Sequence, residues 1–451
     1  MALLLIFAFT FSGWQIVSRS PAVGFATVPR PVLPLAPMQD GASKVSIPSS
    51  MPSQRLLPDG RFRAEAQFVS SSPGQAVHAA SIVELLDGRL RAVWFSGSRE
   101  GASDVSIRTS VMDVKSQQWG DEHTLFDRNI VQQGLWRYVK KLGNPVIARA
   151  PDGSLWLWMV TVSLGGWAGS SITWARSVDE GASWSAPQRL VTSPFLNIST
   201  LVKGAPVFYQ DGHIGLPVYH ELATKFAEIL QINPQGKVLD KTRIPGSQTN
   251  LQPVILVSSP QQAQVYMRSG QAISLMMSET DDGGQTWSPA HATSWANPDS
   301  ALTGVVTTNG QQWLALNPGP RNREILAMLP ARAGGFFEGA TPWIVESSAT
   351  PERRTSLGDY ERLLSDELKS HGVSQAQTEA YVASARRQLC GADTCSQEFS
   401  YPYLLQSRDG YLHLVYTWHR TRIKHVRFDP LQFTPIPPAA PAAMRHVFAT
   451  H

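Results

Sequence analysis

The sequence has only two cysteines, few charged residues and one long apolar run, and each shortage excludes a class of protein. Charged residues make up 16% of the 451-residue chain, and the net charge is +4. No run of Lys or Arg is interleaved with aromatic residues, which argues against a nucleic-acid partner. The cysteines lie five positions apart without a nearby histidine cluster, which argues against a zinc site. We therefore expect no metal or other cofactor, with calcium in Asp- and Asn-rich loops as the one alternative.

The single long apolar run covers residues 1–17. It is long enough for the core of an export signal and short for a membrane span of about 20 residues. We expect residues 1–20 to be an export signal or an uncleaved anchor, with a weak cleavage site, Gly-Phe-Ala, at 24–26. The protein would then be periplasmic, membrane-anchored or secreted, and would touch a membrane only through this segment. In such a compartment Cys390 and Cys395 are expected to form a disulfide.

Glycine, proline and tryptophan are plentiful, with 34, 32 and 14 copies, and this mix is typical of short strands joined by tight turns. Strand-like runs flank Asp-Gly or Asn-Gly turns that begin at positions 87, 152, 211, 309 and 409. Such turns are a strong hairpin signal because their twist matches that of the strands. With a weaker turn near 260, the spacing predicts six repeats of a four-stranded unit. We therefore predict an all-β fold, a six-bladed β-propeller, and expect it to be a monomer.

Residues 351–395 differ from the rest because their pattern is helical. Apolar residues recur at helical spacing from Leu357 to Leu368, Gly372 is a natural C-terminal stop, and Ser374 starts a second helix. We predict a helical insertion before the last blade. The expected domains are a Pro/Ser-rich linker at 21–61, the propeller at 62–432 and a C-terminal tail at 433–451.

Two segments share the pattern S/T-x-D-x-G-x-x-W. They consist of Ser177, Asp179, Gly181 and Trp184, and of Thr280, Asp282, Gly284 and Trp287. In this pattern, called an Asp-box, the hydroxyl and the carboxylate cap a turn that glycine permits, and the tryptophan packs under a neighbouring strand. We expect these aspartates to be structural and not catalytic.

Asp-boxes on a six-repeat all-β chain resemble the sialidase superfamily. The segments "VHAASIVELLDGRLRAVWFSGSREGASDV", "ANPDS" and "FSYPYLLQSRDGYLHLVYTWHRTRIKHV" resemble its BNR-repeat branch, and the likeness runs from about residue 62 to 428 without the helical insertion. In sialidases three arginines hold the substrate carboxylate, an Asp is the acid/base, and a Tyr activated by a Glu is the nucleophile.

The resemblance implies that Tyr401 is the nucleophile and that Glu398 or Glu221 activates it. Arg268 would be the second arginine, and Arg321 or Arg323 the third. Two positions depart from the sialidase pattern. His78 occupies the place of the first arginine, and the acid/base loop offers Arg99, Glu100 and Asp104.

Other polar residues precede the predicted hairpins and are expected at the mouth of the propeller. The substrate-binding candidates among them are Lys141, Asn144, Asn250 and Asn297, and His220 is a further acid/base candidate. Lys203, Gln252 and Asp299 lie in the same kind of position, and Trp167 could stack on a sugar. Arg420, Arg422 and Lys424 alternate along a strand and are expected to coat its outer edge.

Three functions remain open. An exported glycoside hydrolase of sialidase type would act on an acidic glycan, with attack by Tyr401 and protonation of the leaving oxygen by Glu100 or Asp104. A polysaccharide lyase would use His78 or His220 to remove a C5 proton from a uronic acid. A carbohydrate-binding propeller without turnover is the third, and the many ionisable groups at strand ends argue against it.

Overall fold

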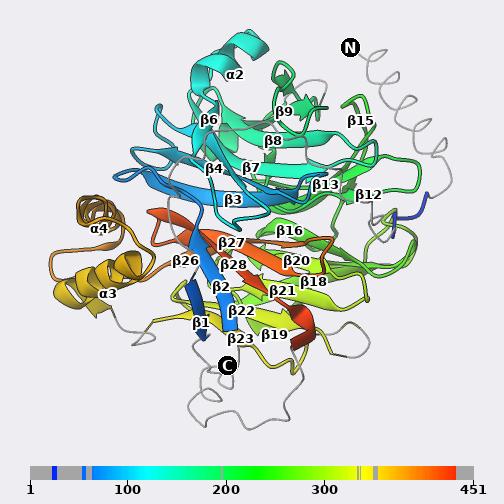
Figure 1. The fold of residues 1–451 in the computed structure, drawn as a ribbon. Helices are drawn as coiled ribbons and strands as arrows, with labels where there is room; N and C mark the ends of the chain where they lie inside the picture. Colours follow the sequence, from blue (N-terminus) through cyan, green and yellow to red (C-terminus); the bar gives the residue numbers. More distant parts are fainter. Residues whose placement is uncertain are drawn as a thin grey trace.

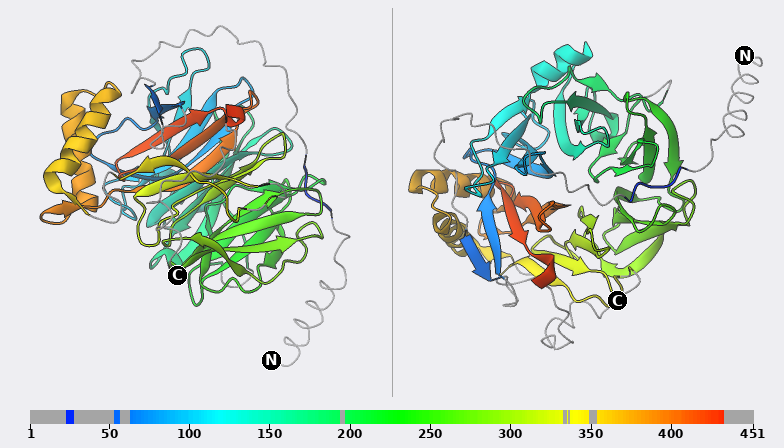
Figure 2. Two further views of the ribbon diagram at one scale, coloured as in Figure 1. Left: turned by 90° about the horizontal axis from the view of Figure 1, so that it is seen from below. Right: turned by 45° about the vertical axis from the view of Figure 1, so that its right-hand side comes forward.

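The computed structural model describes residues 23–27, 53–56, 63–193, 197–332, 335, 337–348 and 354–432. The expected export segment and C-terminal tail lie outside these residues, as does most of the expected linker. Six antiparallel sheets surround a central axis as the blades of a propeller (Figures 1 and 2). The predicted all-β six-bladed fold is confirmed. Within the described ranges, no helix combines the length and the apolar character that a membrane span requires.

The first three blades follow the chain in order, each with its innermost strand first. Blade 1 contains β3 (Ala76–Glu84), β4 (Leu90–Gly97), β5 (Ser106–Met112) and β6 (His123–Phe126). Blade 2 contains β7 (Lys141–Arg149), β8 (Leu155–Val162), β9 (Ser170–Ser177) and β10 (Gln188–Arg189). Blade 3 contains β11 (Leu201–Val202), β12 (Val207–Phe208), β13 (Ile214–His220), β14 (Phe226–Ile232) and β15 (Val238–Arg243). A short helix, α2 (Arg128–Leu135), joins blades 1 and 2, and the 3-10 turn η1 (Trp167–Gly169) follows β8.

The remaining blades repeat the pattern, except that the last one also uses an N-terminal strand. Blade 4 contains β16 (Asn250–Val257), β17 (Ala263–Ser269), β18 (Ser274–Thr280) and β19 (His291–Ala296). Blade 5 contains β20 (Thr303–Val306), β21 (Gln312–Leu316), β22 (Ile325–Pro330) and β23 (Trp343–Ser347). Blade 6 contains β26 (Phe399–Gln406), β27 (Leu412–Trp418), β28 (Arg422–Phe428), β2 (Arg63–Phe68) and β1 (Ser53–Leu56), and η2 (Pro430–Gln432) follows it.

The closure of the ring depends on the pairing of β2 with β28. Glu65 lies opposite Arg427 and Phe68 opposite Lys424, so the strand that precedes blade 1 completes blade 6. Nothing in the local sequence of β2 indicates this partner, because the two strands are more than 350 positions apart. The β1 strand, which pairs with β2, lies inside the range that was expected to be a linker.

The Asp-box turns have the hydrogen bonds that their pattern requires. The Thr280 hydroxyl donates to Asp282 Oδ1 (2.8 Å) and accepts from the Gly284 amide (3.1 Å), while Asp282 accepts from the Thr286 amide (3.0 Å). The side chain of Trp287 is buried against blade 4. The box that begins at Ser177 repeats these contacts. Both boxes lie at the base of the propeller, the face on which the inner strands end.

The predicted helical insertion is present as α3 (Leu357–Ser370) and α4 (Gln375–Leu389). Tyr360, Leu364 and Leu368 form the buried face of α3, and Gly372 has the positive φ of 74° expected of a helix stop. The helices pack beside blade 6 (Figure 1). The first residues of the insertion pair with its last ones as β24 (Thr355–Ser356) and β25 (Thr394–Cys395).

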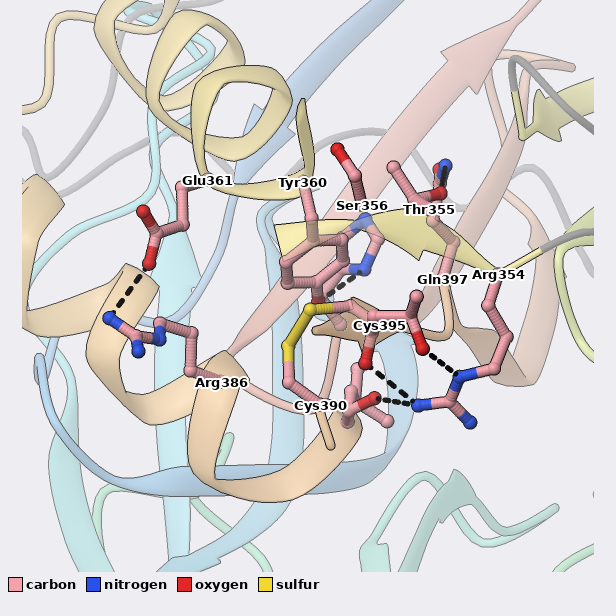
Figure 3. The surroundings of a disulfide bond; sticks show 12 residues. Arg354, Thr355, Ser356, Tyr360, Glu361, Arg386, Cys390, Cys395 and Gln397 are labelled. Atoms are coloured by element: carbon pink, nitrogen blue, oxygen red, sulfur yellow. Dashed lines mark hydrogen bonds and ion pairs between the residues drawn. A yellow bond between two sulfur atoms is a disulfide. The ribbon is translucent and has the colours of Figure 1, made fainter. Parts of the chain in front are cut away.

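Cys390 and Cys395 form a disulfide where α4 ends and the chain returns to blade 6 (Figure 3). Arg354 donates to the side chain and the backbone carbonyl of Thr394, each at 2.9 Å, which fixes β24 against β25. Two residues after the disulfide, the Gln397 amide donates to the hydroxyl of Ser348 (3.0 Å) in the segment that follows blade 5. These contacts fix the point at which the chain enters β26.

A chain of buried hydrogen bonds joins blades 1 and 6 below the surface. Trp119 Nε1 donates to His425 Nδ1 (3.2 Å), His425 Nε2 lies 2.9 Å from His413 Nδ1, and His413 Nε2 lies 2.8 Å from the Ser407 hydroxyl. Because Trp119 can only donate, both imidazoles are assigned as neutral with the proton on Nε2. Protonation of either ring would place two N–H groups face to face.

Asp282→Ala is expected to lower the thermal midpoint by a few degrees, since a lost turn cap costs about 1 kcal/mol. Asp281→Ala changes the adjacent, exposed aspartate, for which no hydrogen bond to a described residue is found, and is the matched control. Differential scanning calorimetry measures both. Equal midpoints for the two variants would contradict a structural role for the box.

The free energy of unfolding is expected to fall as the pH drops below 6.5. Burial is the main cause that lowers the pKa of His413 and of His419 to about 3 and holds those of His78 and His425 well below the ordinary value. Below pH 6.5 these histidines therefore take up protons in the unfolded chain but stay neutral in the folded one. Each such histidine lowers the free energy of unfolding by up to about 1.4 kcal/mol for each unit that the pH falls.

Urea unfolding between pH 8 and 5 measures this loss, with the exposed His291→Asn as a control that keeps the slope. A free energy of unfolding that does not change between pH 6.5 and 5 would contradict the buried neutral histidines.

Candidate functional site

The mouth of the propeller is marked by one residue with positive φ at the start of each inner strand. These residues are Ala79 (55°), Asn144 (40°), Ser199 (60°), Gln252 (50°), Asp299 (54°) and Tyr401 (53°). In β3, β7, β16 and β26 the residue lies at a shift in strand register, which is a β-bulge. Bulges re-aim side chains, and non-glycine residues with positive φ concentrate at functional sites. The repeat therefore places one non-glycine residue with positive φ from each blade around the axis.

The hydroxyl of Tyr401 lies among side chains of blade 4. It accepts hydrogen bonds from Gln252 Nε2 (3.2 Å) and Arg268 Nη1 (3.3 Å). Arg268 also donates from Nε to Asp299 (2.6 Å) and from Nη1 to Gln252 Oε1 (3.0 Å). Its Nη2 makes no hydrogen bond to a described residue. Two donors on one phenolic oxygen, one of them charged, stabilise negative charge there.

His78 lies against the ring of Tyr401, with the two ring centroids 4.1 Å apart. Burial, and after it the charges of Arg420 and Arg323, hold the pKa of His78 well below its ordinary value. The imidazole is therefore neutral. Its Nδ1 is buried and has no hydrogen-bond partner among the described residues.

Lys203 reaches the same place from blade 3. Its ammonium group donates to the carbonyl of Pro402 (3.0 Å) and lies 5.8 Å from the ring centroid of Tyr401. The residue is 2% exposed, and burial lowers the pKa of the amine to about 7. The mouth therefore contains a buried amine that is partly neutral near physiological pH.

Glu398 is held by arginines and not by Tyr401. Its two oxygens each accept from Arg420 Nε at 3.0 Å, one also accepts from Ser400 (2.6 Å), and Arg323 Nη1 lies 3.4 Å away. Burial alone would raise the pKa of Glu398, but the charges of Arg420 and Arg323 outweigh it, so the pKa is lowered. A carboxylate in this state is a poor proton acceptor for the phenol.

The pKa of Glu221 is shifted in the opposite direction to that of Glu398. Burial raises its pKa, against the opposing charges of Lys225 and Arg268. Its amide donates to Ser199 (2.8 Å), and its carboxylate makes no hydrogen bond to a described residue. Of the two carboxylates expected to activate Tyr401, Glu221 is therefore the one suited to exchange protons.

The acid/base loop between β4 and β5 separates its three charged residues. Asp104 accepts from the amide (2.9 Å) and hydroxyl (3.0 Å) of Ser98 and so closes the loop, which is a structural task. Glu100 pairs with Arg420 at 3.0 Å. Arg99 is exposed. Glu100 is thus the loop carboxylate that reaches the group around Glu398.

Lys141 and Trp167 form the blade 2 wall next to this loop. The ammonium of Lys141 lies 4.7 Å from the Trp167 ring centroid. A Cβ on Gly143 would come within 2.8 Å of that ring, so the indole approaches the backbone more closely than a residue with a side chain would allow. Trp167 is half-buried and packs on the core, and its role is at least partly structural.

The other predicted site residues divide into those that face the mouth and those that do not. Asn144 donates to the hydroxyl of Tyr219 (3.2 Å), which lies next to Gln252. Asn297 is fully buried and closes the turn to Ser300. These contacts give Asn297 a structural role in place of the expected substrate contact.

Three further candidates are placed as follows. Asn250 is 2% exposed, and Arg321 is exposed and makes no hydrogen bond or ion pair with a described residue. His220 pairs with Glu228 (3.1 Å) beside a small pocket lined by Ile198, Leu222 and Phe226. Sequence reasoning did not single out Tyr219. The signal for it was its place directly before His220 and Glu221, two predicted site residues.

The expectation that three cations of blade 6 coat an outer edge was wrong. Arg420 lies in the mouth with Glu398, as described above. Arg422 donates to the carbonyl of Ser70 and is buried, and Lys424 is enclosed between Glu346 and Glu367. The edge is covered because β2 pairs with β28 and the helical insertion packs beside it.

The described residues do not bring three or more His, Cys, Asp or Glu side chains together in a way that could hold a metal ion. The carboxylates of Glu100, Asp299 and Glu398 are instead paired with arginines. The arrangement can bind an anion, stabilise negative charge on a phenol and move a proton through Glu221.

The model of the BNR repeat-like domain family matches residues 88–414, which is more than half of the chain. No curated protein matches the sequence well enough to count as a relative. The solved structures that resemble the fold include the Hadza microbial sialidase, with a TM-score of 0.58 and 14% identity over 80% of this chain and 66% of that one.

Two further structures have the same fold. A protein of unknown function from Dyadobacter fermentans has a TM-score of 0.58 and 10% identity, over 80% of this chain and 97% of that one. A leech intramolecular trans-sialidase, complexed with 2,7-anhydro-Neu5Ac, has a TM-score of 0.55 and 11% identity, over 81% and 69%. At these identities the likeness establishes the fold alone.

Lys203→Met is expected to have a higher free energy of unfolding than the wild type, and the difference should be largest at pH 7 and below. Because burial lowers the folded-state pKa of the amine to about 7, the unfolded chain alone holds the proton between pH 7 and 10. The wild type therefore gains stability with rising pH in that window, by up to about 1.4 kcal/mol per pH unit, and the variant lacks this gain. Urea unfolding at pH 7, 8 and 9 measures it. If the difference in the free energy of unfolding between variant and wild type did not shrink toward pH 9, the lowered pKa of the buried amine would be contradicted.

Proposed function

The chain belongs to the BNR repeat-like domain family, and we propose that it is a glycoside hydrolase of sialidase type that acts on an acidic-sugar glycan. The proposal rests on one observation, the hydroxyl of Tyr401 held by Gln252 and Arg268 in a mouth rich in cations. Four cations lie close enough for their charges to lower the pKa of the neighbouring His78: Arg268, Arg323, Arg420 and Lys203. Such a concentration of positive charge favours a substrate with a carboxylate.

Arg268 and Arg323 are the residues proposed to bind that carboxylate. Arg268 Nη2 is free to donate, and the rest of the guanidinium is fixed by Asp299, which orients it. Arg323 is fixed in turn by the carbonyl of Asp299 (2.9 Å) and by Glu398. Arginines that are already oriented lose little freedom on binding. His78 stands in the place of the first arginine, so two guanidinium groups instead of three hold the substrate carboxylate.

Tyr401 is the proposed nucleophile. Arg268 and Gln252 stabilise the phenolate, and Glu221 is the group that takes up the phenol proton. A neutral phenol also avoids the repulsion that a carboxylate nucleophile would meet from an acidic sugar. The phenolate then attacks the anomeric carbon as the bond to the leaving oxygen breaks, and Glu100, after taking a proton from solvent, protonates that oxygen. Water releases the sugar in the reverse sequence of proton transfers.

A second candidate function is β-elimination at a uronic acid. The observation that favours it is the neutral His78, which lies against Tyr401 with an unpartnered Nδ1. That nitrogen could remove the C5 proton while Arg268 neutralises the carboxylate and Tyr401 protonates the leaving oxygen. The two reactions use the same residues in different roles and yield different products.

Incubation of the purified protein with sialosides and uronic-acid glycans separates these functions. Hydrolysis releases a saturated sugar, while elimination creates a conjugated double bond that absorbs in the ultraviolet. We expect the saturated sugar, and we expect Tyr401→Phe to lower kcat/KM by roughly 10²–10⁴-fold. Tyr411→Phe, at the base of the same blade, should retain full activity.

The appearance of the conjugated product in place of the saturated sugar would replace the hydrolase with the lyase. Full activity in Tyr401→Phe would contradict both mechanisms. No product from any acidic glycan, with retained binding, would leave a carbohydrate-binding propeller.

A further inference from the structure

The turn between β27 and β28, residues 419–421, presents Arg420 to the mouth from an unusual backbone conformation. His419 and Arg420 have φ values of 48° and 53°, in the left-handed region that non-glycine residues rarely adopt. Two such residues in succession keep this conformation only where the surrounding structure fixes it. The contacts of this turn, here called the Arg420 turn, therefore decide where the guanidinium lies.

The helical insertion is hydrogen-bonded to every residue of the Arg420 turn. Gln388 Nε2, at the end of α4, donates to the carbonyl of Arg420 (3.1 Å). The hydroxyl of Tyr360, in α3, lies 3.1 Å from His419 Nδ1. The Thr421 hydroxyl donates to a backbone carbonyl of α4 (3.2 Å). Because Tyr360, His419 and Thr421 are fully buried, water cannot easily replace these contacts.

The insertion is also fixed to the propeller at places other than this turn. Ser384 Oγ donates to the carbonyl of Gln75 (3.0 Å), and Arg387 donates to the carbonyl of Gly74 (2.8 Å), both in the segment before β3. The disulfide joins the end of α4 to β25, and Tyr360 is among the residues that surround it in Figure 3. The insertion can therefore act as a fixed support for the turn.

The guanidinium that the turn presents joins two carboxylates from distant parts of the chain. Arg420 Nε lies 3.0 Å from both oxygens of Glu398, and its Nη1 lies 3.0 Å from Glu100. Glu398 also accepts from Arg323 (3.4 Å), one of the arginines proposed to bind the substrate carboxylate. A displaced Arg420 would release Glu100, the proposed acid, from its only ion pair with a described residue.

We propose that Gln388 and Tyr360 are positioning residues for the reaction described above. They hold the Arg420 turn in the arrangement in which its guanidinium pairs with Glu398 and Glu100 together. This inference rests on the proposed function, because it gives the insertion a part in the protonation of the leaving oxygen by Glu100. The helices that interrupt the repeat thereby support the chemistry of the mouth.

The first test compares two substrates in Gln388→Met, which keeps the length of the side chain and removes the donor. With a glycan that leaves as an alkoxide, we expect kcat/KM to fall about tenfold, because the leaving oxygen needs a proton. With an aryl glycoside of the same sugar, whose phenolate leaves without a proton, kcat/KM should stay within about twofold of the wild type. The control is Gln375→Met, at the exposed start of the same helix, and it should change neither. Equal losses on both substrates, or no loss on either, would overturn the inference.

A double-mutant cycle tests whether Gln388 acts through Arg420. Arg420→Gln alone is expected to lower kcat/KM on the alkyl glycan about a hundredfold. In that background Gln388→Met should lower it by less than about twofold more, since the side chain that it positions is already absent. If the two losses multiplied in full, Gln388 would act by another route and the inference would fail.

A third measurement does not depend on activity, so it separates failure of this inference from failure of the proposed function. Hydrogen exchange read by mass spectrometry follows the amides of the Arg420 turn, where the His419 amide donates to the carbonyl of Glu398 (2.8 Å). We expect Gln388→Met and Tyr360→Phe to speed this exchange several-fold and to leave the strands of blade 4 unchanged. Faster exchange in a protein without activity would leave the support of the turn standing and remove the proposed chemistry. Unchanged exchange in both variants would overturn the inference, whether or not the mouth is catalytic.

Discussion

The pairing of β2 with β28 is the constraint on which the other features depend. Each blade can bury its faces only against its neighbours, so the ring is stable only when the last blade meets the first. This pairing joins segments more than 350 positions apart in the chain. It also brings the start of β3 beside β26. His78 therefore lies on Tyr401, and Glu100 reaches Arg420, only because the ring is closed.

The mouth shows how a fold can hold several like charges together. Arg420 and Arg323 share Glu398, while Arg268 is oriented by Asp299. Buried charges are tolerated when they are paired and hydrogen-bonded, and breaking one partner leaves the other uncompensated. The groups without a countercharge, His78 and Lys203, respond with lowered pKa values. The site therefore combines a fixed cationic surface with a neutral imidazole and an amine that is partly neutral near pH 7.

The parts of the site that could be predicted are those with a local signal. Asn144 and Tyr401 each precede their hairpin turn by the same interval, at positions 144 and 152 and at 401 and 409, and both have positive φ at the mouth. Glu398 was expected beside Tyr401 because it is close in sequence. It pairs with Arg420 instead, because antiparallel pairing brings the start of β26 beside the end of β27, and Glu398 and Arg420 flank these two ends. Nearness along the chain did not decide which side chains met.

The sequence by itself determined the turns, the Asp-boxes, the helical insertion and the number of blades. These depend on hydrogen bonds and periodicities within a few residues, as in the cap that Thr280 and Asp282 form. Only the tertiary structure decided which carboxylates are neutralised and that Lys203 and Lys424 are buried. Those outcomes depend on the packing of different blades, since the field at one group is set by charges that neighbouring blades bring within a few ångströms of it.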